Sequence, residues 1–129
     1  MEQSGGKKIL IVDDEPSVRS LVKKLLGKKY TILEAGDGKE AVSMALSHQP
    51  DLILMDILMP KMDGLTACYT IKMNQATKSI PVIMLTAVDY ELNKKLSQDV
   101  MGAHGYITKP FSSQELMAAV GQFMAVPKA

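Results

Sequence analysis

Polar side chains that could act on a phosphoryl group occur at four places in the sequence, each directly after an apolar run. The residues are Asp13-Asp14, Asp56, Thr86 and Lys109. Three carboxylates brought together repel one another, and keeping all of them ionised requires a compensating cation. Because oxygen ligands without sulfur suit a hard ion, these acids predict a Mg²⁺ site if the fold gathers them, and Mn²⁺ could substitute.

The same residues favour one kind of reaction. Mg²⁺ in proteins typically also binds phosphate oxygens, and Lys109 would add a mobile positive charge suited to phosphate. The hydroxyl of Thr86 can donate a hydrogen bond to a further phosphate oxygen. A carboxylate can itself attack phosphorus and form an aspartyl phosphate, which requires in-line positioning and neutralisation of charge.

Apolar runs alternate with amphipathic segments along the chain, and these elements must position the polar residues. Five short apolar runs predict strands at Ile9–Val12, Thr31–Ala35, Leu52–Met55, Val82–Thr86 and Gly105–Thr108. Apolar residues at helical spacing, with two capping-box pairs, Asp37/Glu40 and Ser112/Glu115, predict five helices. These helices are expected at Pro16–Leu26, from Asp37 to about His48, at about Leu65–Met73, near Tyr90–Met101, and from Ser112 to near Met124.

Strict alternation of strand and helix predicts an α/β fold, a three-layer doubly wound domain with a parallel sheet covered on both faces. In such sheets, ligands bind outside the carboxyl ends of the strands. Each of the four polar sites has an ordinary explanation alone: acids favour the first turn of a helix, and Asp56 precedes a loop that contains proline. Those explanations do not predict that all four sites follow the carboxyl ends of strands.

The chain resembles the response-regulator receiver domains of two-component signalling over about residues 7–125. Four motifs carry the resemblance: Ile9-Leu10-Ile11-Val12-Asp13-Asp14-Glu15, Asp56-Ile57-Leu58-Met59-Pro60-Lys61-Met62-Asp63-Gly64, Leu85-Thr86-Ala87, and Gly105-Tyr106-Ile107-Thr108-Lys109-Pro110-Phe111. The second and fourth motifs are highly specific. The resemblance implies a flavodoxin-like (βα)5 domain whose five parallel strands have the order 2-1-3-4-5.

The resemblance also implies a role for each site residue. Asp56 would be the phospho-acceptor and a metal ligand. Asp14 would bind the metal directly, whereas Asp13 would act mostly through metal-bound water. The backbone carbonyl of Leu58 would complete the protein's share of the metal shell, and Lys109 would pair with Asp56 or its phosphate.

Further residues would make the domain a switch. The resemblance implies that Thr86 swings toward the phosphate, that Tyr106 rotates with it, and that the bond before Pro110 is cis. The surface that changes would comprise the helix near 90–101, the strand at 105–108 and the last helix. Two apolar residues, Leu58 and Val88, stand where family members often carry polar groups near the hydrolytic water, so we expect a long-lived aspartyl phosphate.

The implied partners are proteins. The phosphoryl donor would be a phosphohistidine on a sensor histidine kinase or on a histidine phosphotransfer protein, and the receiver would act on a downstream target or an output domain. The net charge of +1 favours neither nucleic acid nor an anionic membrane. A phosphorylation-dependent homodimer remains open, as does the choice between a stand-alone regulator similar to the chemotaxis type and a receiver within a longer protein.

Composition sets the remaining bounds. The 129 residues, 47% of them hydrophobic, suit one globular domain, for which we expect a flexible N-terminus at 1–6, a receiver at 7–125 and a tail at 126–129. A single cysteine, Cys68, excludes an intrachain disulfide, and no Cys/His cluster indicates a zinc site. The polar N-terminus and the lack of a long apolar run predict a cytoplasmic protein.

Three other functions were weighed against this interpretation. In metal-dependent phosphatases with an aspartate nucleophile, that nucleophile is commonly the first residue of a DxD pair after the first strand. Asp13 and Asp14 are adjacent instead, so a turnover enzyme is not expected. A pure interaction domain would not need Asp56, Lys109 and the acid pair. A flavin carrier of similar fold is disfavoured because no phosphate-cradling loop follows the first strand.

Overall fold

The predicted strands form one parallel sheet in the structure, a computed structural model that describes residues 6–86 and 102–124. The strands are β1 (Lys8–Val12), β2 (Thr31–Ala35), β3 (Leu52–Asp56), β4 (Val82–Thr86) and β5 (Gly105–Thr108). Their order across the sheet is β2-β1-β3-β4-β5, which confirms the expected topology. The sheet order places β1 and β3 side by side at its centre.

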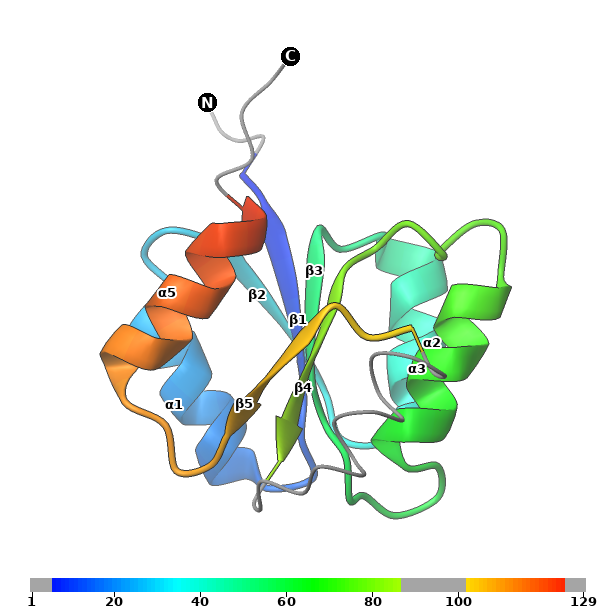
Figure 1. Cartoon of the computed structure of the whole chain (residues 1–129), viewed down its shortest axis with the longest axis horizontal. Coiled ribbons are helices and arrows are strands. Elements are labelled where there is room, and N and C mark those ends of the chain that lie inside the picture. Colours follow the sequence, from blue (N-terminus) through cyan, green and yellow to red (C-terminus); the bar gives the residue numbers. More distant parts are fainter. Residues whose placement is uncertain (1–5, 87–101, 125–129) are drawn as a thin grey trace.

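Helices cover both faces of this sheet, as the alternation predicts (Figure 1). The described helices are α1 (Pro16–Leu26), α2 (Gly38–His48), α3 (Gly64–Met73) and α5 (Ser113–Met124). In the figure, α1 and α5 lie on one face of the sheet, and α2 and α3 lie on the other. The helix expected near 90–101 lies outside the described residues.

Alternate residues of each central strand pack into two separate cores, because successive strand side chains point to opposite faces. Ile9 and Ile11 of β1 join the core under α1 and α5, which contains Val22 and Leu116. The intervening residue of β1, Leu10, joins the core under α2 and α3. All of β3 is buried, so its apolar run reflects burial on both faces.

Both predicted capping pairs form hydrogen bonds where two helices begin, and the second pair forms the complete reciprocal box. The Asp37 carboxylate accepts from the Glu40 amide at 2.8 Å, while the Glu40 carboxylate accepts from the Gly36 amide. At α5, Ser112 and Glu115 exchange both hydrogen bonds of the box. Such caps typically contribute about 1 kcal/mol each.

The loop between β3 and α3 is held against the start of α2. The Gly38 amide donates to the carbonyl of Met62 at 3.0 Å, and a Cβ on Gly38 would lie 2.2 Å from that oxygen. The Lys61 ammonium lies 3.7 Å from the Asp37 carboxylate across the same contact. This loop directly follows Asp56, so its attachment to α2 constrains the residues beside the candidate site.

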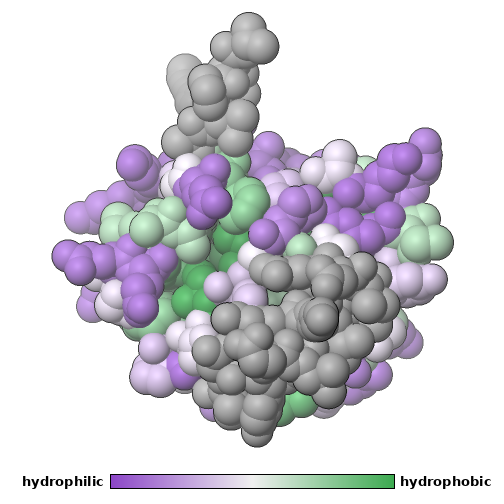
Figure 2. Space-filling model, in the orientation of Figure 1, coloured by the Kyte–Doolittle hydropathy of each residue, from purple (hydrophilic) through white to green (hydrophobic). Residues whose placement is uncertain are grey.

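The surface beside the β5 edge is partly apolar. Figure 2 shows apolar surface next to α5 on this side of the molecule. A hollow of about 340 Å³ lies there, lined among others by Ile83, Tyr106, Ala119 and Phe123. Among the described residues, no helix combines the length and apolar character needed to cross a membrane.

Candidate functional site

Strand register brings the predicted polar residues to one edge of the sheet. Val12 pairs with Met55, so Asp13 and Asp56 follow paired residues on neighbouring strands. Asp56 itself pairs with Leu85, the residue before Thr86. Thr86 in turn pairs with Thr108, which Lys109 follows. The carboxyl ends of β1, β3, β4 and β5 therefore meet where the sequence predicts.

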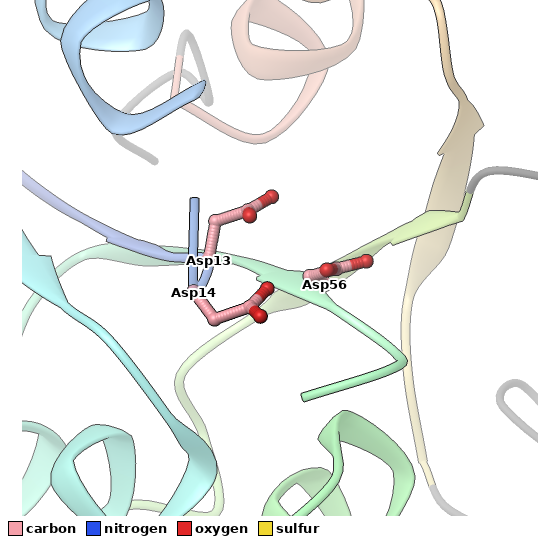
Figure 3. A group of neighbouring side chains, drawn as sticks. All are labelled: Asp13, Asp14 and Asp56. Atoms are coloured by element: carbon pink, nitrogen blue, oxygen red, sulfur yellow. The ribbon is translucent and has the colours of Figure 1, made fainter. Parts of the chain in front are cut away.

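Three carboxylates converge at this edge (Figure 3). One oxygen each from Asp13, Asp14 and Asp56 lie within 4.8 Å of one another. Asp13 and Asp56 are buried, whereas Asp14 is exposed. Since carboxylates at this separation repel one another, the cluster favours binding of a cation.

Every hydrogen-bonding group of Asp13 is occupied, which explains how a fully buried acid is accommodated. Its amide donates to the Ala35 carbonyl at 3.1 Å, and its carboxylate Oδ1 accepts from the Glu15 amide at 3.0 Å. Its Oδ2 lies 2.8 Å from the Lys109 ammonium. Its main-chain carbonyl accepts from the Arg19 guanidinium at 2.7 Å. These contacts fix both the backbone and the side chain of Asp13.

Lys109 bridges the two buried acids. Its Nζ lies 2.8 Å from Asp13 and 3.5 Å from Asp56, so it stands closer to Asp13 than the resemblance alone implies. Partial burial lowers the pKa of Lys109, but its hydrogen bond to Asp13 and the charges of Asp56 and Asp13 outweigh that effect and leave the pKa raised. Lys109 is therefore a fixed cation of the site.

Burial and a neighbouring acid raise the pKa of Asp56 despite this lysine. Burial, followed by the charge of Asp13, raises the pKa of Asp56 from 3.8 to about 6, against the opposing effects of Lys109 and the Ile57 amide. Its Oδ1 accepts from the Ile57 amide at 2.9 Å. Both printed contacts of the Asp56 carboxylate fall on Oδ1, and among the described residues none donates a hydrogen bond to its Oδ2.

The raised pKa predicts how stability depends on pH. The folded state holds the Asp56 proton more tightly than the unfolded state, so stability decreases as the pH rises from about 4 to about 6. We expect metal-free Asp56→Asn to be more stable than the wild type above pH 6, by roughly 2–3 kcal/mol. Below pH 4 this advantage should disappear. Urea unfolding with a chelator between pH 4 and 8 measures it.

The control for this prediction is Asp63→Asn, an exposed acid seven positions along the chain that caps α3. Asparagine also caps helices, so this variant should show no comparable gain at any pH. Equal stability of the wild type and Asp56→Asn at pH 7.5 would show that the charge of Asp56 is already compensated in the folded state.

The donor set fits a hard divalent cation. It offers carboxylate oxygens without sulfur or imidazole, which is the ligand chemistry of Mg²⁺. The exposed Asp14 leaves one side open to water, and Mg²⁺ usually keeps several waters in proteins. Asp13, Asp14 and Asp56 are the residues that could hold the ion, with the Leu58 carbonyl a further predicted ligand.

The other predicted residues are placed to different extents. Leu58 is 78% exposed beside Asp56, and Tyr106 is partly buried on β5. The Lys109–Pro110 peptide bond is cis. Thr86 ends β4, but its side chain is not among those described, and Val88 lies wholly outside the described residues.

Besides the contact of Lys109 with Asp13 and the bond from the Asp13 amide to Ala35, three further contacts of the site were not predicted from the sequence. They are the Arg19 guanidinium on the Asp13 carbonyl, the Glu15 amide on the Asp13 carboxylate, and the Ile57 amide on Asp56. The two amide contacts are local and follow from the short spacing after each acid. Arg19 carried no signal of its own, because a charged residue on a helix usually faces solvent.

Comparisons with known proteins agree with this geometry. The family profile described as response regulator receiver domain matches residues 9–121. The alkaline phosphatase synthesis transcriptional regulatory protein PhoP of Bacillus subtilis is 43% identical over 115 residues, which cover 88% of this chain and 47% of PhoP. The chain thus spans about half the length of this relative.

Solved structures show the same likeness. The chemotaxis protein CheY4 of Vibrio cholerae superposes with a TM-score of 0.87 at 31% identity, covering 92% of this chain and 99% of CheY4. The receiver domain of the sensor histidine kinase PA1611 of Pseudomonas aeruginosa superposes with a TM-score of 0.85 at 29% identity, covering 94% and 99%. Its structure has a magnesium ion coordinated in the active site cleft.

The fold, the three converging carboxylates with their lysine, and the profile match over most of the chain all lead to one family. Receiver domains are regulatory phospho-acceptors that interact with histidine kinases or phosphotransfer proteins and bind Mg²⁺ in an acidic pocket. This chain belongs to the response regulator receiver domain family of two-component signalling.

Proposed function

We propose that Asp56 accepts a phosphoryl group from a phosphohistidine on a sensor histidine kinase or a histidine phosphotransfer protein. The observation that carries the proposal is the environment of Asp56. It is 8% exposed, shares Lys109 with Asp13, and keeps Oδ2 without a hydrogen bond from any described residue. Of the three acids, Asp56 therefore combines a fixed position with an oxygen that is available to a substrate.

The transfer exchanges one bond for another. Oδ2 of Asp56 forms a bond to phosphorus while the bond between phosphorus and the donor imidazole breaks, and the electron pair leaves with the imidazole. Lys109, 3.5 Å from Asp56, offsets negative charge on the incoming phosphoryl group. The Ile57 amide holds Oδ1, so the carboxylate presents its other oxygen.

Asp14, Asp56 and the Leu58 carbonyl would hold a Mg²⁺ ion directly, and Asp13 would hold it mostly through metal-bound water. Bound there, the ion would neutralise charge on the phosphoryl oxygens. Burial, followed by the charge of Asp13, raises the pKa of Asp56 despite Lys109, and a cation bound beside these acids would offset both effects. Mn²⁺, which also takes carboxylate oxygens, would be a functional substitute.

A donor protein must contact the surface around Asp56 in order to present its imidazole. An apolar hollow of about 380 Å³ adjoins the site and is lined by Val18 and Leu21 of α1 and by Lys109, Pro110 and Phe111. Its apolar lining suits the apolar face of a partner helix. We therefore place the donor over α1 and the segment that follows β5.

The output would come from a different surface. Phosphorylation would draw Thr86 toward the phosphate and rotate Tyr106, which lines the hollow between β5 and α5. A change in Tyr106 would thereby alter a face that includes β5, α5 and the helix that the sequence predicts near 90–101. A downstream target, an output domain or a second copy of the chain would bind there.

The domain is proposed to act as a regulator within residues 7–125 in the cytoplasm, and not as a turnover enzyme on an external substrate. It would promote its own phosphorylation and dephosphorylation through the site residues. Within the described part of the chain, β1 runs directly into α1 through three residues, which leaves no insertion there to enclose a small substrate.

Uptake of a phosphoryl group by the wild type tests the proposal. The domain is incubated with acetyl phosphate and Mg²⁺, and its intact mass is recorded with and without a chelator. A gain of one phosphoryl group that depends on the metal is expected. No gain, although Mg²⁺ binding is confirmed, would favour a pure interaction module, and sustained turnover of a phosphoester would favour a phosphatase.

The lifetime of the aspartyl phosphate provides a separate prediction. Leu58 is 78% exposed beside the site, so its side chain is available to cover the phosphate and restrict the attacking water. Asparagine at this position could orient the attacking water. We therefore expect the aspartyl phosphate of Leu58→Asn to hydrolyse roughly tenfold faster than that of the wild type. Intact mass recorded over time after removal of acetyl phosphate measures the decay.

The matched control is Leu46→Asn. Leu46 is another exposed leucine and lies on α2, so this change should leave the decay of the aspartyl phosphate unchanged. Loss of the wild-type phosphate within seconds under native conditions would contradict the role assigned to Leu58, as would equal decay of the wild type and Leu58→Asn.

A further inference from the structure

Asp14 presents a positioning problem that the site residues alone do not solve. Its side chain is exposed, and no described residue donates a hydrogen bond to its carboxylate. A metal ligand must nevertheless be held close to its binding geometry for high affinity. The position of the Asp14 carboxylate therefore depends on the main chain that joins it to Asp13.

Arg19 of α1 holds that main chain. Its Nη1 donates to the carbonyl oxygen of Asp13 at 2.7 Å, and this carbonyl belongs to the peptide unit that links Asp13 to Asp14. Its Nε donates to Glu34 Oε1 at 3.1 Å. The two donors of one planar guanidinium thus fix the direction of this peptide relative to β2.

The other side of Asp13 is attached to the same strand. The Asp13 amide donates to the Ala35 carbonyl at 3.1 Å, and Ala35 directly follows Glu34 on β2. Both peptide units that flank Asp13 are consequently held to the end of β2, one directly and one through Arg19 and Glu34. β2 contributes no predicted metal ligand, but it holds the main chain on both sides of Asp13 in place.

We infer that Arg19 is a positioning residue of the metal site, acting through the Asp13 carbonyl to direct the Asp14 carboxylate. This inference rests on the proposed Mg²⁺ site. It has a clear competitor, because an arginine beside an acid cluster should weaken cation binding by repulsion if only its charge matters. Loss of the contact and loss of the charge therefore change Mg²⁺ affinity in opposite directions.

Arg19→Lys separates these effects, since lysine keeps the charge but cannot donate from two fixed positions of one plane. We expect its Mg²⁺ affinity, measured by titration calorimetry of the metal-free domain, to decrease by about 10-fold or more, as for other residues that orient metal ligands. With acetyl phosphate, saturating Mg²⁺ should restore most of the phosphorylation rate.

Lys23→Met is the matched control. Lys23 lies on the same helix and approaches the same Glu34 at 3.9 Å, and no described contact joins it to Asp13. Because solvent screens the exposed Lys23 ammonium, Lys23→Met should leave the Mg²⁺ affinity within about twofold of that of the wild type. An equal loss in both variants would show a general structural effect of changing α1 and would overturn the inference.

The remaining outcomes are also distinct. Arg19→Lys that binds Mg²⁺ as tightly as the wild type would overturn the role of Arg19, whereas a wild type that binds no Mg²⁺ would overturn the proposed site itself. If Arg19→Lys shows no cooperative unfolding transition in a urea titration, it is not folded and Glu34→Ala is used in its place. That variant keeps Arg19 but removes the acceptor that orients it, and an unchanged Mg²⁺ affinity would likewise contradict the inference.

Discussion

Asp56→Asn is expected to take up no phosphoryl group from acetyl phosphate under conditions in which the wild type gains one. An amide is not a nucleophile toward phosphorus, and the change leaves the size of the side chain almost unaltered. Neither neighbouring acid should replace it. Both carboxylate oxygens of Asp13 are engaged, by the Glu15 amide and by Lys109.

Asp14 is the acid that requires a direct test, since it is exposed. If Asp14 is only a metal ligand, Asp14→Asn should still be phosphorylated once the Mg²⁺ concentration is raised, because its defect is in affinity. If Asp14 were the acceptor, no concentration of Mg²⁺ would restore uptake. The comparison of the two variants by intact mass therefore separates the acceptor from the ligand.

Asp63→Asn controls for the loss of a carboxylate near the site. Asp63 caps α3 through the Thr66 amide, and asparagine preserves that cap, so uptake should equal that of the wild type. Residual phosphorylation of Asp56→Asn at a rate comparable to the wild type would place the acceptor at another residue and contradict the proposed function.

The residues that gather at the sheet edge could be predicted because they obey a rule of topology. Asp13 follows β1, Asp56 ends β3 and Lys109 follows β5, and parallel strands bring their carboxyl ends to one edge. The capping pairs could also be predicted, since the two residues of each pair are only three positions apart. The strand order, in contrast, came from the family resemblance and not from the residues.

The contacts that the sequence does not reveal are those between distant segments. Nothing local indicates that the Arg19 guanidinium reaches back to the Asp13 carbonyl and across to Glu34, because its position on α1 is also compatible with a solvated charge. Nor does spacing indicate that Lys109 lies nearer to Asp13 than to Asp56. Such details depend on how the helices pack against the sheet.

Glycines illustrate the same limit. Asp37-Gly38 and Asp63-Gly64 both resemble turn dipeptides, for which a positive φ is the usual reason for glycine. Gly102 is the one glycine with positive φ among the described residues. Gly38 and Gly64 are required instead by close approach of a backbone carbonyl, from Met62 and from Asp56 respectively.

Gly64→Ala is expected to produce the largest loss of stability among single methyl additions to the described glycines. A Cβ at this position would lie 2.0 Å from the Asp56 carbonyl oxygen and 2.9 Å from Met84 Cε. A methionine end can move, but the carbonyl belongs to the central strand of the sheet. We expect a loss of about 3 kcal/mol or more in the free energy of unfolding.

Gly121→Ala is the matched control, because it makes the same change inside a helix where the new Cβ would meet no atom within 4 Å other than its chain neighbours and the nearby backbone of its own helix. Alanine is the better helix former by about 0.5–1 kcal/mol, so this variant should be neutral or more stable. Urea unfolding of both variants gives the comparison. A Gly64→Ala variant within about 0.5 kcal/mol of the wild type would show that the β3–α3 segment yields easily.

The consequence of Gly64→Ala should extend from stability to the site. The Gly64 amide donates to the Ile57 carbonyl at 2.7 Å, which closes the segment that carries Leu58 and its predicted metal-binding carbonyl. Relieving the clash must move either this segment or the end of β3, whose last residue is Asp56. The folded fraction of Gly64→Ala should therefore bind Mg²⁺ more weakly than wild type, whereas Gly121→Ala should bind it equally well.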